Sequence, residues 1–377
     1  MTIRTIHRAT LQTWLTTGTP GQSAEFALLD LRDEQDFAKG QPLFATNLPL
    51  RRLEADVARF VPRRSVRTVL VDDGNGDAAK GAAILDALGY DDVAILSGGV
   101  PGWLSDSPNG LPTFDIAGNI FTVAVADQRG TPALTVAALK AAQDAGEDIL
   151  VLDTRTPEEF ARSHIPGSRS LPGGELLQRY LDYVPSAQTH VVVTCAWLAR
   201  AIIGAQTLIS ARVPNRVSYL VEGTQAWSRA GYALETGISD SFDGYSEAAA
   251  AFGAAHARNL ADEAGVQWID AAAVGQWQGE ADRTTYLLDV RLPAPFEAGH
   301  LAGSISAPGG QLLAVSHRTV AVRGARIVLI DDSEGDVRAI TTAYWLKQRG
   351  WDARVFDGTI QDRLPGADAR ERIAQPA

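Results

Sequence analysis

The sequence predicts an α/β protein of three similar tandem domains, each a mostly parallel open sheet with helices on both faces. A Leu-Asp-x-Arg motif occurs three times, at Leu29–Arg32, Leu152–Arg155 and Leu288–Arg291. Each copy follows an apolar, strand-like run and precedes an acidic or proline-containing stretch that is typical of a helix start. Short apolar strands that alternate with helices indicate parallel sheets covered on both faces.

The three copies keep the same spacing beyond this motif, which is the mark of an internal repeat. Eleven residues after the Asp of the motif, each copy has a polar landmark: Gln41, His164 and His300. Forty-two residues after that Asp, each copy has just ended a second apolar strand: Asp72, Cys195 and Asp331. These three strand-end positions are therefore equivalent.

A helical pattern follows each second strand, over Ala78–Leu88, Ala196–Ser210 and Val337–Arg349. Gly89 and Gly350 stand where a helix is expected to stop. Next comes a further short strand, which in the first two copies leads to a glycine turn and a tryptophan; the third copy lacks this tryptophan.

The segments between the repeats set the predicted domain limits. A helix is expected to begin at Thr131 as its cap, with Pro132 at the first helical position. Residues 108–128 and 236–245 are interpreted as connections, and 247–264 as an extra helix whose role is packing rather than binding a partner. The predicted domains are residues 1–115, 124–240 and 246–377.

Composition narrows the function. The net charge of −11 over 377 residues argues against nucleic acid as the main partner, because such binding relies on clustered Lys and Arg. No apolar stretch is long enough for a membrane span and no signal segment opens the sequence, so we expect a cytoplasmic protein without a membrane partner. The six scattered histidines and the single cysteine predict neither a metal site nor a disulfide.

The single cysteine, Cys195, is the candidate nucleophile. A free cysteine is often just a small buried hydrophobe. Cys195, however, lies at the carboxyl end of a strand, where open parallel sheets bind ligands, and a helix is expected to begin there. The backbone N–H groups of residues 196–200 would then lower the thiol pKa and cradle an anion, and Arg200 would add a positive charge. We therefore favour a reactive thiol.

Two segments of the second copy resemble those of the rhodanese family. Phe160–Ser168 is similar to the family signature of an aromatic residue followed by His-Ile-Pro-Gly-Ala, and Cys195–Arg200 is similar to its six-residue active loop. The resemblance implies a sulfurtransferase that needs no cofactor. Cys195 would take sulfur from a small anionic donor such as thiosulfate and pass the persulfide sulfur to a thiol or cyanide-like acceptor, or to a protein.

The resemblance also implies roles for individual residues. The substrate-binding loop would comprise Ala196, Trp197, Leu198, Ala199 and Arg200. The supporting residues would be Asp153, Arg155 and His164, although the recurrence of Asp and Arg in copies without cysteine favours a structural role for them. Leu198 stands where many family loops have glycine, and Trp197 is bulky for a substrate loop, so the identity of the sulfur donor stays open.

The first and third copies are expected to be catalytically silent. Their loops, residues 72–77 and 331–336, carry carboxylates in place of the thiol and the arginine, which would repel thiosulfate. Three carboxylates around a turn can bind a hard cation, but Asp and Gly also suit turns and helix starts, which is the interpretation we prefer. In tandem members of the family a silent domain precedes the active one and packs beside it.

Two other functions stay open. Phosphatases of rhodanese-like fold also set a Cys and an Arg around an anion loop, but with five residues between them; here there are four. The second alternative is a non-enzymatic sulfur relay or a scaffold whose silent domains bind proteins.

Overall fold

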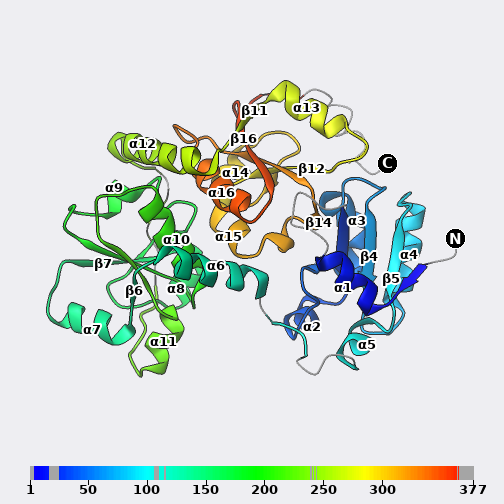
Figure 1. Cartoon of the computed structure of the whole chain (residues 1–377), viewed down its shortest axis with the longest axis horizontal. Coiled ribbons are helices and arrows are strands. Elements are labelled where there is room, and N and C mark those ends of the chain that lie inside the picture. Colours follow the sequence, from blue (N-terminus) through cyan, green and yellow to red (C-terminus); the bar gives the residue numbers. More distant parts are fainter. Residues whose placement is uncertain are drawn as a thin grey trace.

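The computed structural model describes residues 4–16, 25–105, 110–113, 116–237, 240, 242, 244–362 and 364. It contains three sheets, one in each repeat (Figure 1). We call the repeats domain 1 (blue to cyan in Figure 1), domain 2 (green) and domain 3 (yellow to red). The predicted fold class is confirmed.

Each sheet is built on the two strands that the repeat predicted. In domain 1 the order is β1 (Arg4–Ile6), β5 (Val93–Leu96), β4 (Arg67–Val71), β2 (Phe26–Asp30) and β14 (Val322–Arg323), and β3 (Thr46–Asn47) also pairs with β2. In domain 2 it is β6 (Ala133–Leu134), β10 (Val217–Leu220), β9 (His190–Thr194), β7 (Ile149–Asp153) and β8 (Arg169–Ser170). In domain 3 it is β11 (Trp268–Asp270), β16 (Asp352–Asp357), β15 (Arg326–Ile330), β12 (Thr285–Asp289) and β13 (Ile305–Ser306).

Parallel pairing brings the candidate site residues to one edge. Asp153, the last residue of β7, pairs in register with Thr194, the last residue of β9. Asp289 of β12 pairs with Ile330 of β15 in the same way. The Leu-Asp-x-Arg motif and the strand-end loop therefore lie side by side at the carboxyl ends of the strands, where ligands bind in open parallel sheets.

Helices cover the sheets and join the domains. Those that follow the second strand of each repeat are α4 (Asp77–Ala87), α10 (Ala199–Ser210) and α16 (Val337–Gln348). The others are α1 (Arg8–Thr16), α2 (Glu34–Ala38), α3 (Leu50–Phe60), α5 (Gly99–Ser105), α6 (Ile116–Arg129), α7 (Val136–Asp144), α8 (Pro157–Arg162), α9 (Tyr180–Tyr183), α11 (Gly223–Arg229), α12 (Glu247–Ala264), α13 (Ala271–Gly279), α14 (Pro293–Ala298) and α15 (Gly309–Ala314), with a 3₁₀ turn at Ser316–Arg318. Within the described part of the chain, no helix has the length and apolarity needed to cross a membrane.

Two predictions about the segments between domains are wrong. The helix expected from Thr131 begins only at Val136, because residues 133–134 form the edge strand β6 against β10. Thr135 is its cap and accepts a hydrogen bond from the Ala138 amide. The stretch interpreted as a connection at 108–128 contains α6, which packs against α10 and ends at Arg129, where the guanidinium pairs with Glu263.

The extra helix between domains 2 and 3 is confirmed. Helix α12 spans residues 247–264, as predicted, and Ser246 and Gly265 close its two ends. Of the predicted connection at 236–245, residues 238, 239, 241 and 243 lie outside the described residues.

Domain 3 is the direct neighbour of both other domains (Figure 1). Its β14 pairs antiparallel with β2 and so completes the sheet of domain 1. Its α16 meets domain 2, where Trp345 Nε1 donates a 2.8 Å hydrogen bond to Thr207 Oγ1 on α10. The tandem pattern predicted that domain 1 would pack beside domain 2. In the structure, the silent domain against the active-loop helix is domain 3.

Candidate active site

Cys195 follows β9 directly and is 3% exposed. Helix α10 begins at Ala199, three residues later than predicted, because residues 195–198 form a loop over the sheet edge. The backbone amides of Trp197 and Ala201 act on the sulfur and favour its anionic form. Of the amides predicted to cradle an anion, only that of Trp197 is among those that act on the thiol, and the Ala201 amide is an addition that the sequence analysis did not name.

The electrostatic environment of this thiol differs from the expected one. Burial raises the pKa of Cys195, whereas Arg200 and the two amides act in the opposite direction without overcoming it. The net pKa of the thiol is therefore raised, not lowered as we expected, although the loop amides and Arg200 act in the predicted direction. The cause is desolvation, which favours the neutral form of a buried thiol.

A glycine turn supports the loop from behind. Gly223 has a φ of +49°, and a Cβ at this position would lie 2.0 Å from the Cys195 carbonyl oxygen. The amides of Thr224 and Gln225 donate to the carbonyls of Cys195 and Ala196 at 3.0 and 3.2 Å. This is the glycine turn that the sequence placed before the tryptophan in copies one and two, and it fixes the loop backbone.

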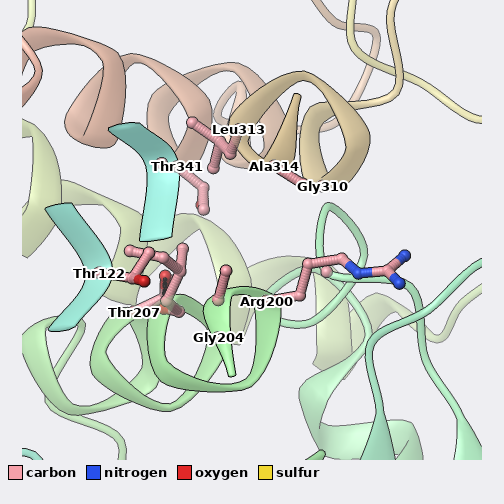
Figure 2. Close-up of a pocket in the computed structure, with 12 residues that line it drawn as sticks. Thr122, Arg200, Gly204, Thr207, Gly310, Leu313, Ala314 and Thr341 are labelled. Atoms are coloured by element: carbon pink, nitrogen blue, oxygen red, sulfur yellow. Dashed lines mark hydrogen bonds between the residues drawn. The ribbon is translucent and has the colours of Figure 1, made fainter. Parts of the chain in front are cut away.

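Arg200 is held by a carboxylate that the sequence analysis missed. Its Nη1 and Nη2 each lie 2.7 Å from an oxygen of Glu159, in a two-pronged ion pair. Although burial opposes it, this pairing lowers the pKa of Glu159 to about 2. Figure 2 shows the guanidinium pointing away from Gly204 and Thr207 on the same helix.

Glu159 also caps helix α8. Its Oε2 accepts from the Thr156 amide at 3.0 Å, and the Thr156 hydroxyl accepts from the Glu159 amide. A Thr-x-x-Glu pattern is the ordinary sequence sign of a helix cap. The pattern was therefore visible, but nothing in it indicated that the same carboxylate would reach Arg200.

The supporting residues have partners that recur across the domains. In each domain the motif Arg bonds the motif Asp through Nε and Nη2, and Arg155 Nη2 lies 2.7 Å from Asp153 Oδ2. His164 stacks on Phe160 at 3.9 Å between ring centroids, and its Nδ1 lies 3.0 Å from the Phe160 carbonyl oxygen. His300 repeats this arrangement on Phe296 in domain 3.

The domain 3 loop differs from its predicted form. Arg338 is the second residue of α16, as Arg200 is the second residue of α10. Copy three thus keeps the arginine that we expected a carboxylate to replace. A count of five residues from the strand-end position, as from Cys195 to Arg200, leads to Asp336 in domain 3. The loop of domain 3 is two residues longer, so the residue equivalent to Arg200 is Arg338.

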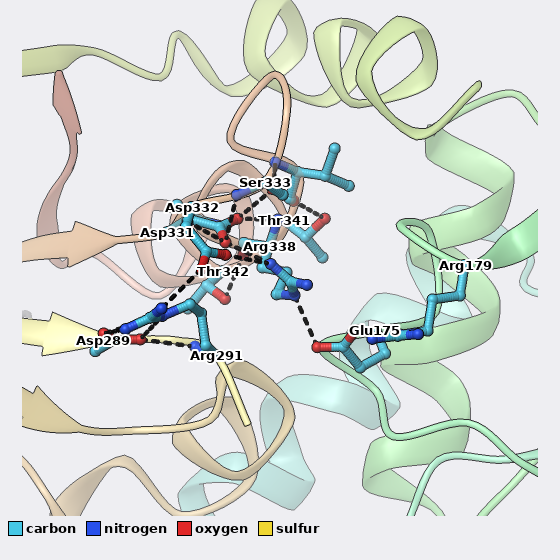
Figure 3. Close-up of polar contacts among 12 residues, drawn as sticks. Glu175, Arg179, Asp289, Arg291, Asp331, Asp332, Ser333, Arg338, Thr341 and Thr342 are labelled. Atoms are coloured by element: carbon cyan, nitrogen blue, oxygen red, sulfur yellow. Dashed lines mark hydrogen bonds and ion pairs between the residues drawn. The ribbon is translucent and has the colours of Figure 1, made fainter. Parts of the chain in front are cut away.

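In domain 3 a carboxylate occupies the cradle at the helix start. Asp331 accepts hydrogen bonds from the amides of Asp332, Ser333, Arg338 and Ala339, and its Oδ1 lies 2.7 Å from Arg338 Nη1. Figure 3 shows this cluster. The side chain of Asp331 is fully buried, so the cradle of domain 3 is filled by the chain itself.

Arg338 also bridges domains 3 and 2. Its Nε lies 2.7 Å from Glu175 Oε1, and the other oxygen of Glu175 bonds Arg179 at 2.7 Å (Figure 3). The Glu175 side chain is 2% exposed. An ion-pair chain therefore joins the silent loop to domain 2.

The domain 1 loop uses its carboxylate as a local cap. Asp72 accepts from the amides of Gly74 and Ala78 at 2.9 Å. This agrees with the turn and helix-start interpretation. Among the residues that the structure describes, no group of three His, Cys, Asp or Glu side chains could hold a metal ion.

Two cavities lie between domains 2 and 3. The smaller, about 30 Å³, is lined by Ala199 and Arg200 on one side and by Gly310 on the other (Figure 2). The larger, about 840 Å³, is lined by Thr154 and Arg155 of domain 2 and, in domain 3, by residues 290, 292–295, 297–298 and 308–311. It is within the size range of small-molecule sites.

Comparison with known proteins identifies the repeat. The family model of the rhodanese-like domain matches residues 12–106, 135–230 and 270–362. The crystal structure of a thiosulfate sulfurtransferase from Pseudomonas aeruginosa superposes with a TM-score of 0.86 and is 42% identical, over 96% of this chain and 68% of that one.

Two curated relatives match over shorter stretches. "Putative thiosulfate sulfurtransferase SseB" of Mycobacterium tuberculosis is 33% identical over 138 residues, or 33% of this chain and 47% of the relative. An HTH-type transcriptional regulator of the same organism is 34% identical over 118 residues, 30% of this chain and 50% of the regulator. The alignments thus span about half the length of these relatives. With three matching domains and a close structural relative, the chain belongs to the rhodanese-like family.

Proposed function

We propose that the protein is a sulfurtransferase that carries sulfane sulfur on Cys195. The observation that supports this most is the position of Cys195 within its repeat: it lies at a helix start, where the Trp197 and Ala201 amides favour its anionic form, and the equivalent position in domain 3 holds a buried carboxylate, Asp331. A site that stabilises one anion in domain 3 suits a thiolate or persulfide anion in domain 2.

The reaction has two steps. The Cys195 thiolate attacks the outer sulfur of thiosulfate, a new S–S bond forms, and the S–S bond of thiosulfate breaks as sulfite leaves with its electron pair. An acceptor such as cyanide then attacks the outer sulfur of the persulfide, and Cys195 departs as the thiolate. This is covalent catalysis by an activated nucleophile.

The burial of the thiol sets a condition on the first step. At 3% exposure, Cys195 can meet a donor only when neighbouring side chains move aside. Trp197 and Leu198 are half-buried loop residues and are the candidates for this movement. The raised thiol pKa implies that activity increases with pH until the thiol has ionised, because only the thiolate attacks.

Steady-state kinetics test the proposal. Thiocyanate formation from thiosulfate and cyanide should follow ping-pong kinetics, and Cys195→Ser should abolish it while leaving the circular dichroism spectrum unchanged. Retained turnover in Cys195→Ser would refute the covalent route. Efficient hydrolysis of an aryl phosphate without thiocyanate formation would favour a phosphatase instead, although four residues between Cys195 and Arg200 speak against one.

A further inference from the structure

The three motif arginines have different partners at their outer nitrogen. In domain 3, Arg291 Nη1 lies 2.7 Å from Asp332 Oδ2. In domain 1, Arg32 Nη1 donates a hydrogen bond to the Asp36 carbonyl oxygen at 3.3 Å and lies 3.7 Å from Asp73 Oδ1. Each of these acids is the first residue after the strand-end position. Both silent domains therefore turn the motif arginine towards a carboxylate of their own loop.

The active domain lacks that carboxylate. The residue after Cys195 is Ala196, so Arg155 has no loop acid within reach at this position. The Nε and Nη2 of Arg155 are used by Asp153 and by the Ser163 carbonyl, and among the described residues Nη1 has no hydrogen-bond partner. Arg155 is 5% exposed, and it lines the 840 Å³ cavity between domains 2 and 3.

Arg200 is a weaker candidate than Arg155 for binding an anion. Two of its N–H groups are bound by Glu159, so its charge is already balanced. Arg155 is balanced in charge by Asp153, but its Nη1 has no hydrogen-bond partner among the described residues, and the residue lines the cavity. A guanidinium N–H that has no hydrogen-bond partner can donate to an oxyanion, because guanidinium geometry suits carboxylate and sulfonate oxygens.

We propose that Arg155 Nη1 binds the oxyanion head group of the sulfur donor, in the place that Asp332 and Asp73 fill in the silent domains. The inference rests on the proposed sulfurtransferase function and adds the donor-binding residue. In domain 3, Asp331 then takes the place of the Cys195 sulfur and Asp332 that of the donor oxyanion. The carboxylates of the silent loop thus occupy the positions that the thiolate and the bound donor would occupy in the active loop.

The oxyanion can be a sulfonate-type group, as in thiosulfate, or a carboxylate, as in a mercapto acid. Inert anions of both kinds can be tested without any sulfur transfer. Because Cys195 is the only cysteine, its alkylation by iodoacetamide is read cleanly by intact mass. Sulfate or pyruvate bound at Arg155 should slow this alkylation several-fold and saturably; if neither protects, the proposal is wrong.

A carboxylate introduced into the loop provides the decisive comparison. Ala196→Asp should place an acid on Arg155, as in domain 3, and weaken anion protection at least tenfold. The matched variant Ala196→Asn has the same shape without the charge and should retain protection within about twofold. Leu198→Asp adds the same charge elsewhere in the loop. If it abolishes protection as fully as Ala196→Asp, general repulsion explains the result and the proposal fails.

A titration of the wild-type protein guards against misfolding of these variants. In a ¹⁵N-arginine-labelled sample, the Arg155 side-chain resonance, assigned with Arg155→Lys, should shift on addition of the protecting anion; an unchanged resonance overturns the inference. Protection without any persulfide would defeat the proposed function alone. Persulfide formation without anion protection would defeat this inference alone.

Discussion

The ion-pair chain between domains 2 and 3 predicts a large loss of stability for Arg338→Met. Arg338 connects Asp331 and Glu175 at 2.7 Å each, and all three side chains are 6% exposed or less. Removing one partner of a buried ion pair typically costs about 3–5 kcal/mol. We expect about 3 kcal/mol here, because backbone amides still bind Asp331 and Arg179 still pairs with Glu175.

Urea unfolding monitored by circular dichroism measures this loss. The control is Arg51→Met, which removes an ion pair whose arginine is 55% exposed and should cost less than about 1 kcal/mol. A double-mutant cycle with Glu175→Gln should give a coupling above about 1 kcal/mol. If Arg338→Met costs no more than Arg51→Met, or the cycle gives no coupling, the chain does not stabilise the interface.

The same cluster predicts how stability depends on pH. Although burial opposes it, Arg338 and Ser333 hold the pKa of Asp331 below its ordinary value of 3.8. A depressed carboxyl pKa contributes stability above the unfolded value and loses it as pH falls below that value. Arg338→Met removes part of this depression, so its stability should fall less steeply between pH 4 and pH 2 than that of the wild type.

Two further substitutions probe the active loop. Gly223→Ala should lower the free energy of unfolding by more than about 2 kcal/mol and reduce activity strongly, because its Cβ would clash with the Cys195 carbonyl. The control is Gly231→Ala, at a φ of +82° with open space around it. It should lower the free energy of unfolding by only about 1 kcal/mol and leave turnover unchanged. Glu159→Gln can still cap its helix but no longer balances Arg200, so the pKa of Cys195 should fall; an unchanged pH profile of alkylation would contradict that electrostatic picture.

The repeat explains why so much of the fold could be predicted. Buried parallel strands are continuous apolar runs that can be recognised in the sequence. A motif at a fixed spacing from them indicates which strand ends lie next to each other. Asp153 and Thr194 pair in register for this reason. The edge strand at residues 133–134 could not be recognised, because two residues carry no periodicity and its pairing depends on β10, far along the chain.

The candidate site was predicted less completely than the fold. Cys195 and Arg200 follow from the position of the loop, but the Glu159 partner of Arg200 lies 41 residues away, on another helix. The arginine of domain 3 was missed because the longer loop shifts Arg338 by two positions. Long-range ion pairs and loop insertions leave no periodic signal in one sequence.

Domain packing was the least predictable feature. The contact between Trp345 and Thr207 and the antiparallel pairing of β14 with β2 join segments separated by more than a hundred residues. Nothing in the composition of either segment indicates which segment it packs against. The exact domain limits at 1–115, 124–240 and 246–377 stay a prediction.

Intact-mass analysis after incubation with thiosulfate tests the central claim most directly. We predict a gain of roughly 32 Da, one sulfur atom, that cyanide removes as thiocyanate and that Cys195→Ser does not show. A wild-type protein that gains no sulfur from thiosulfate or mercaptopyruvate, or a Cys195→Ser variant that gains as much as the wild type, would contradict a persulfide on Cys195.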